Sequence, residues 1–474
     1  MLRREPCPGT LDAAGAGAYG VRTRQAGGGA NKLSTQLLWS AAVAALGAFL
    51  FGFDTAVISG ATDALRLRFA LNSNQLGFTV ASALIGTIVG SIAAGAPSER
   101  YGRRPVLKTL AVLYFLSAAG CGFAPNWVSL LIFRFIGGLA IGASSVVAPM
   151  YIAEIAPAAL RGRLVGLSQF NVVAGILAAY FSNYIIAALL GGPATTAWRW
   201  MLGIAVVPAV IFFLFLLSIP ESPRWLVKQH RREEAADVLR TMGNETPDAL
   251  VGDIADSLHE ETVSAHEPFF QRKYLRPILL AVMVASFNQL AGINALIYYT
   301  ADIFKMAGAE RTSALLQSVI IGFTNLIFTM IAMTVIDRVG RKRLLLIGAV
   351  GLAGCLGLTA WAFHAGVGGT LVLASLLGYI AFFAFSQGAV IWVYISEIFP
   401  NRVRARGQAL GSFTHWFWAA VVSWTFPIIA EASGAAAFAF FAVMMVLQFV
   451  LVWRFLPETK GVSLEEIQRM LGIE

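Results

Sequence analysis

Twelve long apolar runs divide this chain, and they constrain its fold more than any other feature of the sequence. Most of them reach or exceed the roughly 20 residues that a helix needs to cross a bilayer. With 57% hydrophobic and only 13% charged residues, the chain has too few charges for a soluble protein. The sequence therefore predicts an all-α membrane protein with twelve transmembrane helices. The runs lie near residues 37–60, 77–97, 106–124, 127–150, 164–190, 200–219, 276–303, 313–336, 344–364, 370–395, 408–430 and 435–456.

The charges and cysteines argue against several other classes of protein. Net charge is +9, but the basic residues form short clusters between apolar runs, so we expect no nucleic-acid partner. Cys7, Cys121 and Cys355 show neither paired nor metal-ligand spacing, so we expect no disulfide framework, no metal and no other cofactor. The sequence contains no nucleophile motif or phosphate loop, which argues against an enzyme.

Basic segments mark one set of alternating loops. The opposite loops carry almost no Lys or Arg, apart from Arg66 and Arg68. The positive-inside rule then predicts that both termini and the long polar segment lie in the cytoplasm. We expect the membrane to be the plasma membrane or the bacterial inner membrane. The basic loops are ERYGRRP (99–105), LRGR (160–163), the polar segment 227–274, DRVGRKR (337–343) and NRVRAR (401–406).

Three motif pairs repeat in the same order at a spacing of about 240 residues, which indicates a duplicated six-helix unit. They are ERYGRR at 99 and DRVGRK at 337, EIAPAALRG at 154 and EIFPNRVRARG at 397, and PESPR at 220 and PETKG at 457. Parallel repeats of this kind suggest a transporter with a substrate site between the halves. We expect a disordered tail (1–36), two halves (37–226 and 275–460), a cytoplasmic linker with short amphipathic helices (227–274) and a short tail (461–474).

The motifs resemble the sugar porter family of the major facilitator superfamily over about residues 37–461. The resemblance implies the major facilitator fold. The family includes proton–sugar symporters and facilitative glucose transporters. It rests on GxxxER-x-GRR at 95–104, PMYIAEIAPAALRG at 149–162, PESPRWL at 220–226, NQLAGINALIYY at 288–299 and PETKG at 457–461.

A sugar offers hydroxyls and C–H faces, which amides and aromatic rings can bind. Asn288 and Gln289 lie near the middle of their run, but Gln289 and Asn294 point about 140° apart on a continuous helix. We therefore expect a helix break at Gly292; on spacing alone, these amides could equally hold helices together. The resemblance adds sugar contacts at Gln169, Asn325, Trp392 and Trp416, with Phe51 and Tyr298 shaping the cavity and its outer gate.

The chain departs from the family pattern at Asn288, which is usually Gln, at Ala384, which is acidic in animal glucose transporters, and at His415, which is usually Gln or Asn. These changes leave a polar site, but the sequence does not identify the preferred sugar. His415 is either a neutral hydrogen-bonding residue of the site or a proton relay. Trp392 could also belong to an interfacial aromatic belt.

Asp54 and Arg134 are charges deep inside apolar runs. Both lie about 9–10 Å below the outer edge, counted at about 1.5 Å per residue, so a pair is expected. A permanent ion pair is one interpretation. The other is a carboxylate that titrates during transport, and the resemblance favours it, because proton-coupled members carry Asp at this position.

A second set of charges lies in the basic loops. The resemblance implies a cytoplasmic gate of salt bridges between the halves, which closes in the outward-open state and breaks in the inward-open state. The alternative is that these charges only fix the orientation of the helices in the membrane, a role that needs no salt bridges. Glu99 replaces the more common Asp of the first motif. The gate residues are Arg103, Arg104, Glu154 and Arg161 in the first half and Asp337, Arg341, Glu397 and Arg404 in the second.

We therefore expect a secondary transporter that moves a monosaccharide by alternating access, with protons as the coupling ion, as a monomer in the lipid bilayer. A facilitative sugar uniporter is the alternative within the same fold. A non-transporting sugar sensor is the alternative of another class, and the short C-terminal segment after PETK argues against it.

Overall fold

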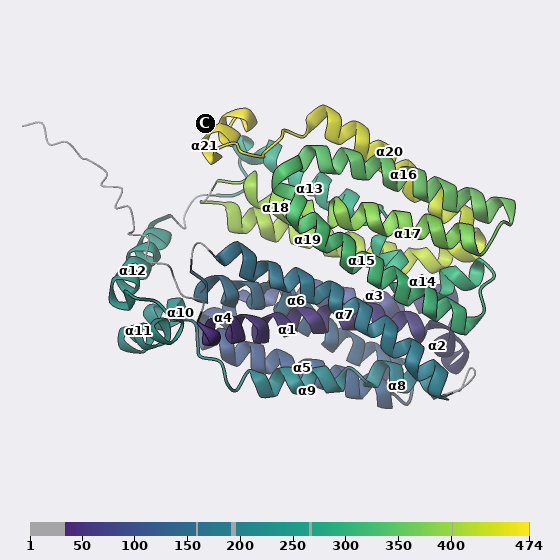
Figure 1. The fold of residues 1–474 in the computed structure, drawn as a ribbon, viewed down its shortest axis with the longest axis horizontal. Coiled ribbons are helices and arrows are strands. Elements are labelled where there is room, and N and C mark those ends of the chain that lie inside the picture. Colours follow the sequence, from purple (N-terminus) through teal and green to yellow (C-terminus); the bar gives the residue numbers. More distant parts are fainter. Residues whose placement is uncertain (1–33, 158–159, 191–195, 265–267, 401, 474) are drawn as a thin grey trace, which may run out of the picture.

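The computed structural model describes residues 34–157, 160–190, 196–264, 268–400 and 402–473. Most of these residues are helical, and the long helices form two halves that lie side by side (Figure 1). A small group of helices caps one end of the bundle. Residues 1–33 of the predicted tail 1–36 lie outside the described residues. The first helix begins at Thr35, just before the predicted end of the tail.

The first half contains α1 (Thr35–Val57), η1 (Ile58–Gly60), α2 (Thr62–Phe69), α3 (Ser73–Ala93), α4 (Gly95–Tyr101), α5 (Arg103–Phe123), α6 (Trp127–Ile155), α7 (Arg161–Leu190), α8 (Ala197–Gly203) and α9 (Val206–Phe215). The linker contains α10 (Pro223–Lys228), α11 (Arg232–Thr241) and α12 (Pro247–Ser264). The second half contains η2 (Arg272–Tyr274), α13 (Leu275–Leu290), α14 (Ile293–Met306), α15 (Arg311–Val339), α16 (Arg341–Ala365), α17 (Thr370–Phe385), α18 (Gln387–Glu397), α19 (Arg404–Ala432) and α20 (Gly434–Phe455), and α21 (Leu464–Leu471) follows it.

Each predicted apolar run coincides with one long helix or with two short helices in succession. Among the described residues, eleven helical segments are long and apolar enough to cross a membrane. The run 408–430 lies in α19, which has 29 residues but begins with the polar stretch Arg404–Gln408. Counted with α19, the described residues contain the twelve membrane helices that the sequence predicts.

Glycines allow the helices of the first half to approach closely. A Cβ added to Gly138 of α6 would stand 1.9 Å from the carbonyl oxygen of Ala83 in α3. A Cβ on Gly90 of α3 would stand 2.2 Å from the carbonyl oxygen of Leu139. Small residues at helix contacts are the usual means of packing in a bilayer, where no hydrophobic effect draws helices together. The glycine-rich runs thus form a rigid half.

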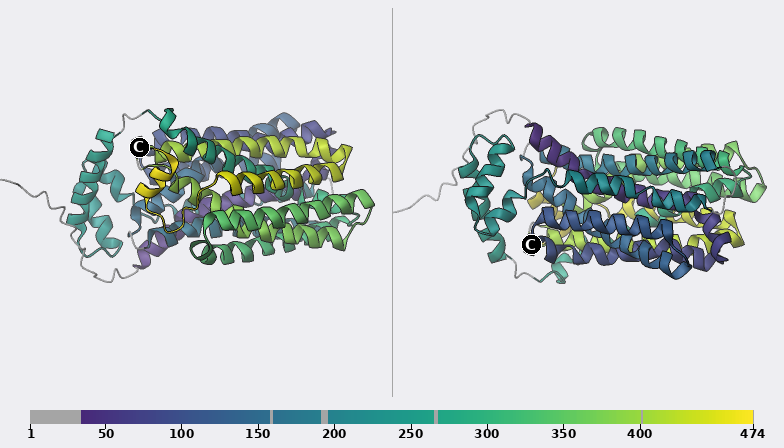
Figure 2. Two further views of the ribbon diagram at one scale, coloured as in Figure 1. Left: turned by 90° about the horizontal axis from the view of Figure 1, so that it is seen from above. Right: turned by 90° about the horizontal axis from the view of Figure 1, so that it is seen from below.

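The linker and both described ends of the chain gather at one end of the bundle, which we call the linker end (Figures 1 and 2). The Ser34 hydroxyl donates to the carbonyl oxygen of Thr241 in α11 at 2.9 Å. Arg276 of α13 donates to the carbonyl oxygen of Met470 in α21 at 2.9 Å. Within this linker Arg232–Thr241 forms α11, and α10 and α12 pack beside it.

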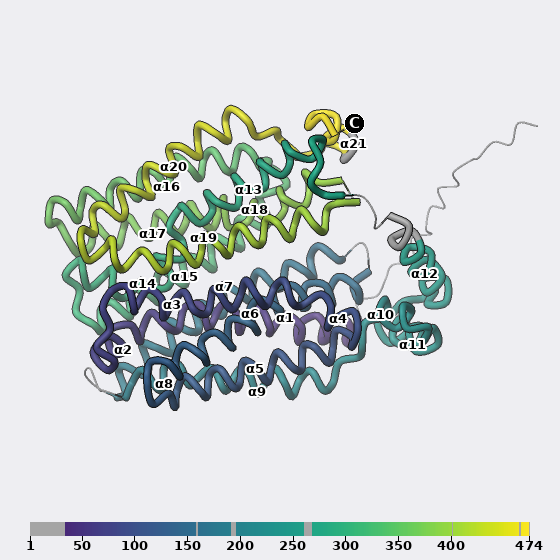
Figure 3. Tube along the Cα trace, turned by 180° about the vertical axis from the view of Figure 1, so that it is seen from behind, coloured from purple at the N-terminus to yellow at the C-terminus, as the bar shows by residue number. Residues whose placement is uncertain are grey.

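At the opposite end, which the positive-inside prediction places on the outer side and which we call the outer end, the two halves touch directly. The Trp424 indole of α19 donates to Asn74 Oδ1 of α3 at 2.8 Å. A Cβ on Gly77 of α3 would stand 2.1 Å from the carbonyl oxygen of Trp424. Tyr180 of α7 donates to the carbonyl oxygen of Ile297 in α14 at 2.8 Å. The view from behind shows α2, α3 and α7 beside α14 and α15 in this region (Figure 3).

Candidate functional site

The membrane segment 272–306 is broken in its middle, as predicted. Helix α13 ends at Leu290, and α14 begins at Ile293 after Gly292 with φ +87°. That conformation favours glycine, and a Cβ here would also stand 2.6 Å from the Phe441 ring. The break brings Gln289 and Asn294 into the buried interior, 1% and 8% exposed.

Gln289 is the centre of a small polar network. Its Nε2 lies 3.1 Å from Asn288 Oδ1 and 3.1 and 3.2 Å from the two ring nitrogens of His415. Its Oε1 is buried and accepts no hydrogen bond from the described part of the chain. A buried acceptor without a partner costs about 1–3 kcal/mol, which a hydroxyl donor from a ligand would recover. Gln289 is therefore suited to bind a hydroxylated molecule.

Aromatic rings stand beside this network. His415 lies between two tryptophans, with ring centroids 5.0 Å from Trp392 and 4.8 Å from Trp416. Phe51 of α1 meets Trp416 of α19 edge to face at 5.5 Å, so the first half contributes to the same group. Trp392 is 39% exposed and next to His415, which places it at the site.

The remaining predicted sugar contacts come from three helices. Asn325 of α15 is buried, and its Oδ1 accepts a long bond of 3.5 Å from Thr329. Gln169 is a half-buried residue of α7. Tyr298 of α14 is 2% exposed and lies close to Thr55 of α1. These residues are on helices of both halves, as a site between the halves requires.

Asp54 and Arg134 form the ion pair that their matching depth predicts. Arg134 Nη1 donates to Asp54 Oδ2 at 2.9 Å, and the side chains are 1% and 17% exposed, Arg134 first. Arg134 Nε and Nη2 are buried and have no hydrogen-bond partner among the residues that the structure describes. The arginine thus depends on one carboxylate, and a change at Asp54 leaves a buried, unpaired cation.

The gate charges of the first half pair within that half. Arg103 binds both oxygens of Glu154 at 2.8 and 2.9 Å and also contacts Glu99 at 3.1 Å. Arg104 donates to the carbonyl oxygens of Leu216 and Leu217 at 3.2 and 2.6 Å.

The second half repeats this cluster. Arg341 contacts Glu397 at 2.9 Å and Asp337 at 3.1 Å, so Arg341 corresponds to Arg103 and Asp337 to Glu99. Arg161 and Arg404 donate to backbone carbonyls of their own halves, those of Ala153 and Phe399. Salt bridges between the halves remain a prediction for another conformation.

The sequence did not assign a role to two glutamates that organise these clusters. Glu221 accepts from the backbone amides of Arg103 and Arg104, and Glu458 accepts from those of Arg341 and Lys342. Burial raises the pKa of Glu221, partly offset by the amides of Ser222, Arg104 and Arg103. The repeated Pro-Glu-Ser and Pro-Glu-Thr in PESPR and PETKG were the signal for this role.

A second break near the site was not predicted. Helix α17 ends at Phe385, and α18 begins at Gln387 after Ser386 with φ −115° and ψ −85°. The Gln387 carbonyl accepts from Asn288 at 3.4 Å, and its side chain donates to Gln448 at 2.7 Å. The break thus brings a backbone carbonyl to Asn288, whereas the Gln387 side chain joins α18 to α20.

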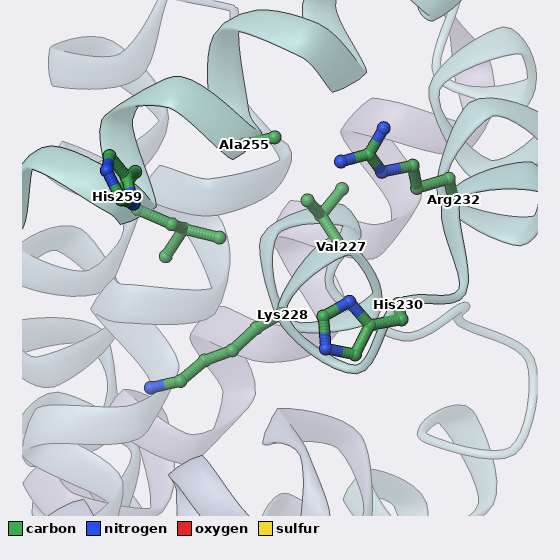
Figure 4. Close-up of a pocket in the computed structure, with 7 residues that line it drawn as sticks. Val227, Lys228, His230, Arg232, Ala255 and His259 are labelled. Carbon is green, nitrogen blue, oxygen red and sulfur yellow. The ribbon is translucent and has the colours of Figure 1, made fainter. Parts of the chain in front are cut away.

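A separate hollow of about 450 Å³ lies in the linker, away from the central residues (Figure 4). In the figure the Lys228 side chain extends away from His230 and Arg232. Lys228 instead pairs with Glu99, whose pKa is held below its usual value of 4.5: burial raises it, and Lys228 and Arg103 together outweigh that effect. The pair attaches α10 to α4.

Two repeated six-helix halves around a central polar and aromatic site define a secondary transporter of the membrane. A sequence model of the family described as "Sugar (and other) transporter" matches residues 40–471. The chain is 39% identical to the D-xylose-proton symporter of Escherichia coli (strain K12) over 470 residues, covering 90% of this chain and 94% of that one. It is 38% identical to the arabinose-proton symporter of Bacillus subtilis (strain 168), covering 90% and 93%. The chain belongs to the sugar transporter family, whose members are transporters and not enzymes.

Solved structures confirm the major facilitator fold. The partially occluded inward-open structure of the xylose transporter XylE from E. coli matches with a TM-score of 0.81 and 38% identity, covering 91% of this chain and 100% of that one. The structure of the proton:xylose symporter XylE bound to 6-bromo-6-deoxy-D-glucose matches with a TM-score of 0.76 and 38% identity, covering 92% and 99%. The protein is thus a multi-pass membrane transporter.

Proposed function

We propose that this protein is a proton-coupled symporter of a monosaccharide, with an aldopentose such as D-xylose or L-arabinose, or glucose, as the first substrates to test. The observation that carries the proposal is the buried pair of Asp54 and Arg134, one turn of α1 away from the aromatic group of the site. The names of the relatives support both the substrate class and the coupling ion.

Gln289, Asn288 and His415 would bind sugar hydroxyls, since each carries polar atoms in the buried centre. Trp416 and Trp392 would cover the C–H faces. Asn294, Asn325 and Gln169 would supply further amides, and Phe51 and Tyr298 would bound the site from opposite halves. His415 would act as a neutral hydrogen-bonding residue, because it lies between two aromatic rings and faces an amide rather than a charge.

Asp54 would supply the coupling. Ionised, it neutralises Arg134; protonated, it releases the arginine and changes the position of α1. Phe51 lies three residues before Asp54 on that helix and touches Trp416 of the other half. A shift of α1 would therefore reach both the sugar site and the contact between halves.

The conformation supports an inward-facing state with the linker end and both termini in the cytoplasm. The halves contact each other at the outer end, and the described gate carboxylates pair inside their own halves at the linker end. The inward-open structures of XylE also match with higher TM-scores, 0.81, than the sugar-bound structure, 0.76. In the outward-facing state, Arg161 and Arg404 would bridge the halves to the gate carboxylates.

The test is Asp54→Asn in proteoliposomes with a panel of labelled sugars. The variant keeps size and hydrogen-bonding capacity but loses the titrating group. We expect sugar accumulation driven by a pH gradient to disappear, while counterflow exchange continues. A facilitative uniporter would show no such accumulation even in the wild type. A permanent structural pair would instead lower expression and both activities together.

A further inference from the structure

The outer end contains a second carboxylate that the proposed coupling does not use. Asp302 lies near the end of α14, one turn before Lys305. Its Oδ1 accepts a hydrogen bond of 3.0 Å from the hydroxyl of Thr62, which belongs to α2 of the other half. Its Oδ2 is shielded from solvent and has no hydrogen-bond partner in the described structure.

Two nearby cations, Lys305 and Arg66, contact other groups. Lys305 forms an ion pair with Asp63, the residue next to Thr62. Arg66 interacts with Asp302 only over a longer range, and its guanidinium donates to Ser73 at 3.5 Å. The charged and titratable groups on the elements around Asp302 include Asp63 and Arg66 of α2, Tyr299 and Lys305 of α14, and Arg311 of α15. Arg311 acts on Lys305 rather than on Asp302, and its Nη2 is buried with no hydrogen-bond partner among the described residues.

Two consecutive residues of one half thus meet two residues of the other half that are one turn apart. We call these four residues, Thr62, Asp63, Asp302 and Lys305, the outer clasp. The pair of Asp63 and Lys305 balances its own charge and needs no proton. The pair of Thr62 and Asp302 is not balanced in charge, because a hydroxyl cannot neutralise a carboxylate whose second oxygen is buried and unpaired.

We propose that Asp302 is a proton-sensing residue of the outer gate, protonated when the outer clasp is closed and ionised when the clasp opens to external water. A neutral carboxyl is far less costly to bury than a carboxylate without a cation. Opening separates Asp302 from Thr62 and exposes both oxygens to water, so the ionised form is then favoured. Closure at the outer end therefore takes up one proton from outside.

This role differs from coupling. The same external water supplies the proton on closing and receives it on opening, so Asp302 moves no net charge across the membrane. It sets how readily the gate closes at a given external pH. The proposal deepens the proposed symport function, since an acidic exterior would favour the step that carries bound sugar inward.

The experiment measures the gate directly and needs neither sugar nor transport. Spin labels at Leu67 of α2 and Met306 of α14, 76% and 42% exposed, report the distance across the outer clasp. The native cysteines are replaced beforehand. The full-length protein is measured in nanodiscs by double electron–electron resonance between about pH 5 and pH 8. The ratio of closed to open populations should rise as pH falls, by at most tenfold per pH unit for a single linked proton.

Asp302→Asn mimics the protonated acid and still accepts from Thr62. It should hold the closed fraction at pH 8 near the wild-type value at pH 5 and flatten the pH profile. Asp63→Asn, the matched control, should lower the closed fraction at every pH and keep the slope. Asp302→Glu should also keep a pH dependence. A purely structural hydrogen bond predicts that Asp302→Asn leaves the wild-type profile unchanged, and that result would overturn the proposal.

Two further measurements, the pH response of the wild type and sugar accumulation in the variants, separate a gate role from a coupling role. If the wild-type distance distribution does not change with pH, the proposal fails, whatever the variants do. Sugar accumulation under an imposed pH gradient should persist in Asp302→Asn and disappear in Asp54→Asn. Loss of accumulation in both variants would make Asp302 a coupling residue and refute a gate-only role. A wild type that never accumulates sugar would refute the symport function alone.

Discussion

Gly102 and Gly340 begin the two helices whose first turns carry the gate arginines, and we expect neither to tolerate a side chain. Gly102 has φ +97° and ψ 166°, and Gly340 has φ +103° and ψ 156°. Such backbone is essentially restricted to glycine. A Cβ on Gly102 would also stand 2.4 Å from Glu221 Oε2, and one on Gly340 would stand 2.7 Å from Glu458 Oε2.

The cost of Gly102→Ala has two parts. Backbone strain in this region contributes about 1–3 kcal/mol. Displacing the Glu221 carboxylate weakens its bonds to the amides of Arg103 and Arg104, for about 1–3 kcal/mol more. We therefore expect a loss of about 2–5 kcal/mol in the free energy of unfolding, since relaxation will recover part of the sum. Gly340→Ala should behave in the same way because Glu458 repeats the arrangement.

The assay is thermal unfolding of the purified protein in detergent, followed by the fraction that remains monodisperse after heating. Gly95→Ala is the control, because a Cβ at that position in α4 has nothing within 4 Å. Alanine in a helix should leave the control as stable as the wild type or slightly more stable. The reasoning is wrong if Gly102→Ala melts together with Gly95→Ala.

Two further predictions concern the sugar site and the linker. Gln289→Ala should weaken binding of every transported sugar about 5- to 150-fold, the equivalent of about 1–3 kcal/mol, in isothermal titration calorimetry. Unchanged binding in a well-folded variant would exclude Gln289 from the site. Glu99 has a lowered pKa, so its stabilisation of the linker is present above pH 4.5 and lost as the pH falls below that value. Hydrogen exchange in α10 should accelerate on acidification in the wild type, and Glu99→Gln should show the faster exchange already at neutral pH; equal exchange in the two proteins at neutral pH would contradict this.

The parts of the fold that follow from local sequence could be predicted. The length of the apolar runs predicted the membrane helices, and the repeated motifs predicted the two halves. A glycine close to three amides predicted the break at Gly292. The break at Ser386 could not be predicted in this way. Two prolines, Pro149 and Pro427, stand inside continuous helices, whereas the break falls at a serine whose hydroxyl bonds the Phe382 carbonyl. A break in a membrane helix frees backbone N–H and C=O groups, and groups on neighbouring segments decide whether these find new hydrogen-bond partners.

The parts of the site that depend on contacts between distant segments needed the structure. Depth alone predicted the pair of Asp54 and Arg134, because buried charges require partners. Nothing in the local sequence of Asp302 indicates that Thr62 lies beside it, since the two residues are 240 positions apart. The repeat of PESPR and PETKG marked Glu221 and Glu458, but their partners needed the structure, because these glutamates bind backbone amides rather than charged side chains.

The two ends of the bundle are held by different kinds of interaction, and this difference bears on how the transporter moves. At the linker end, each half balances its own charges, so separating the halves leaves the described ion pairs intact. At the outer end, the described residues of the two halves share hydrogen bonds and one partly exposed ion pair, that of Asp63 and Lys305, each worth about 1 kcal/mol net. The outer contacts therefore hold the closed state by only a few kcal/mol. A sugar or a proton with a modest preference for one state can shift such an equilibrium, whereas halves joined by buried ion pairs at both ends would be locked.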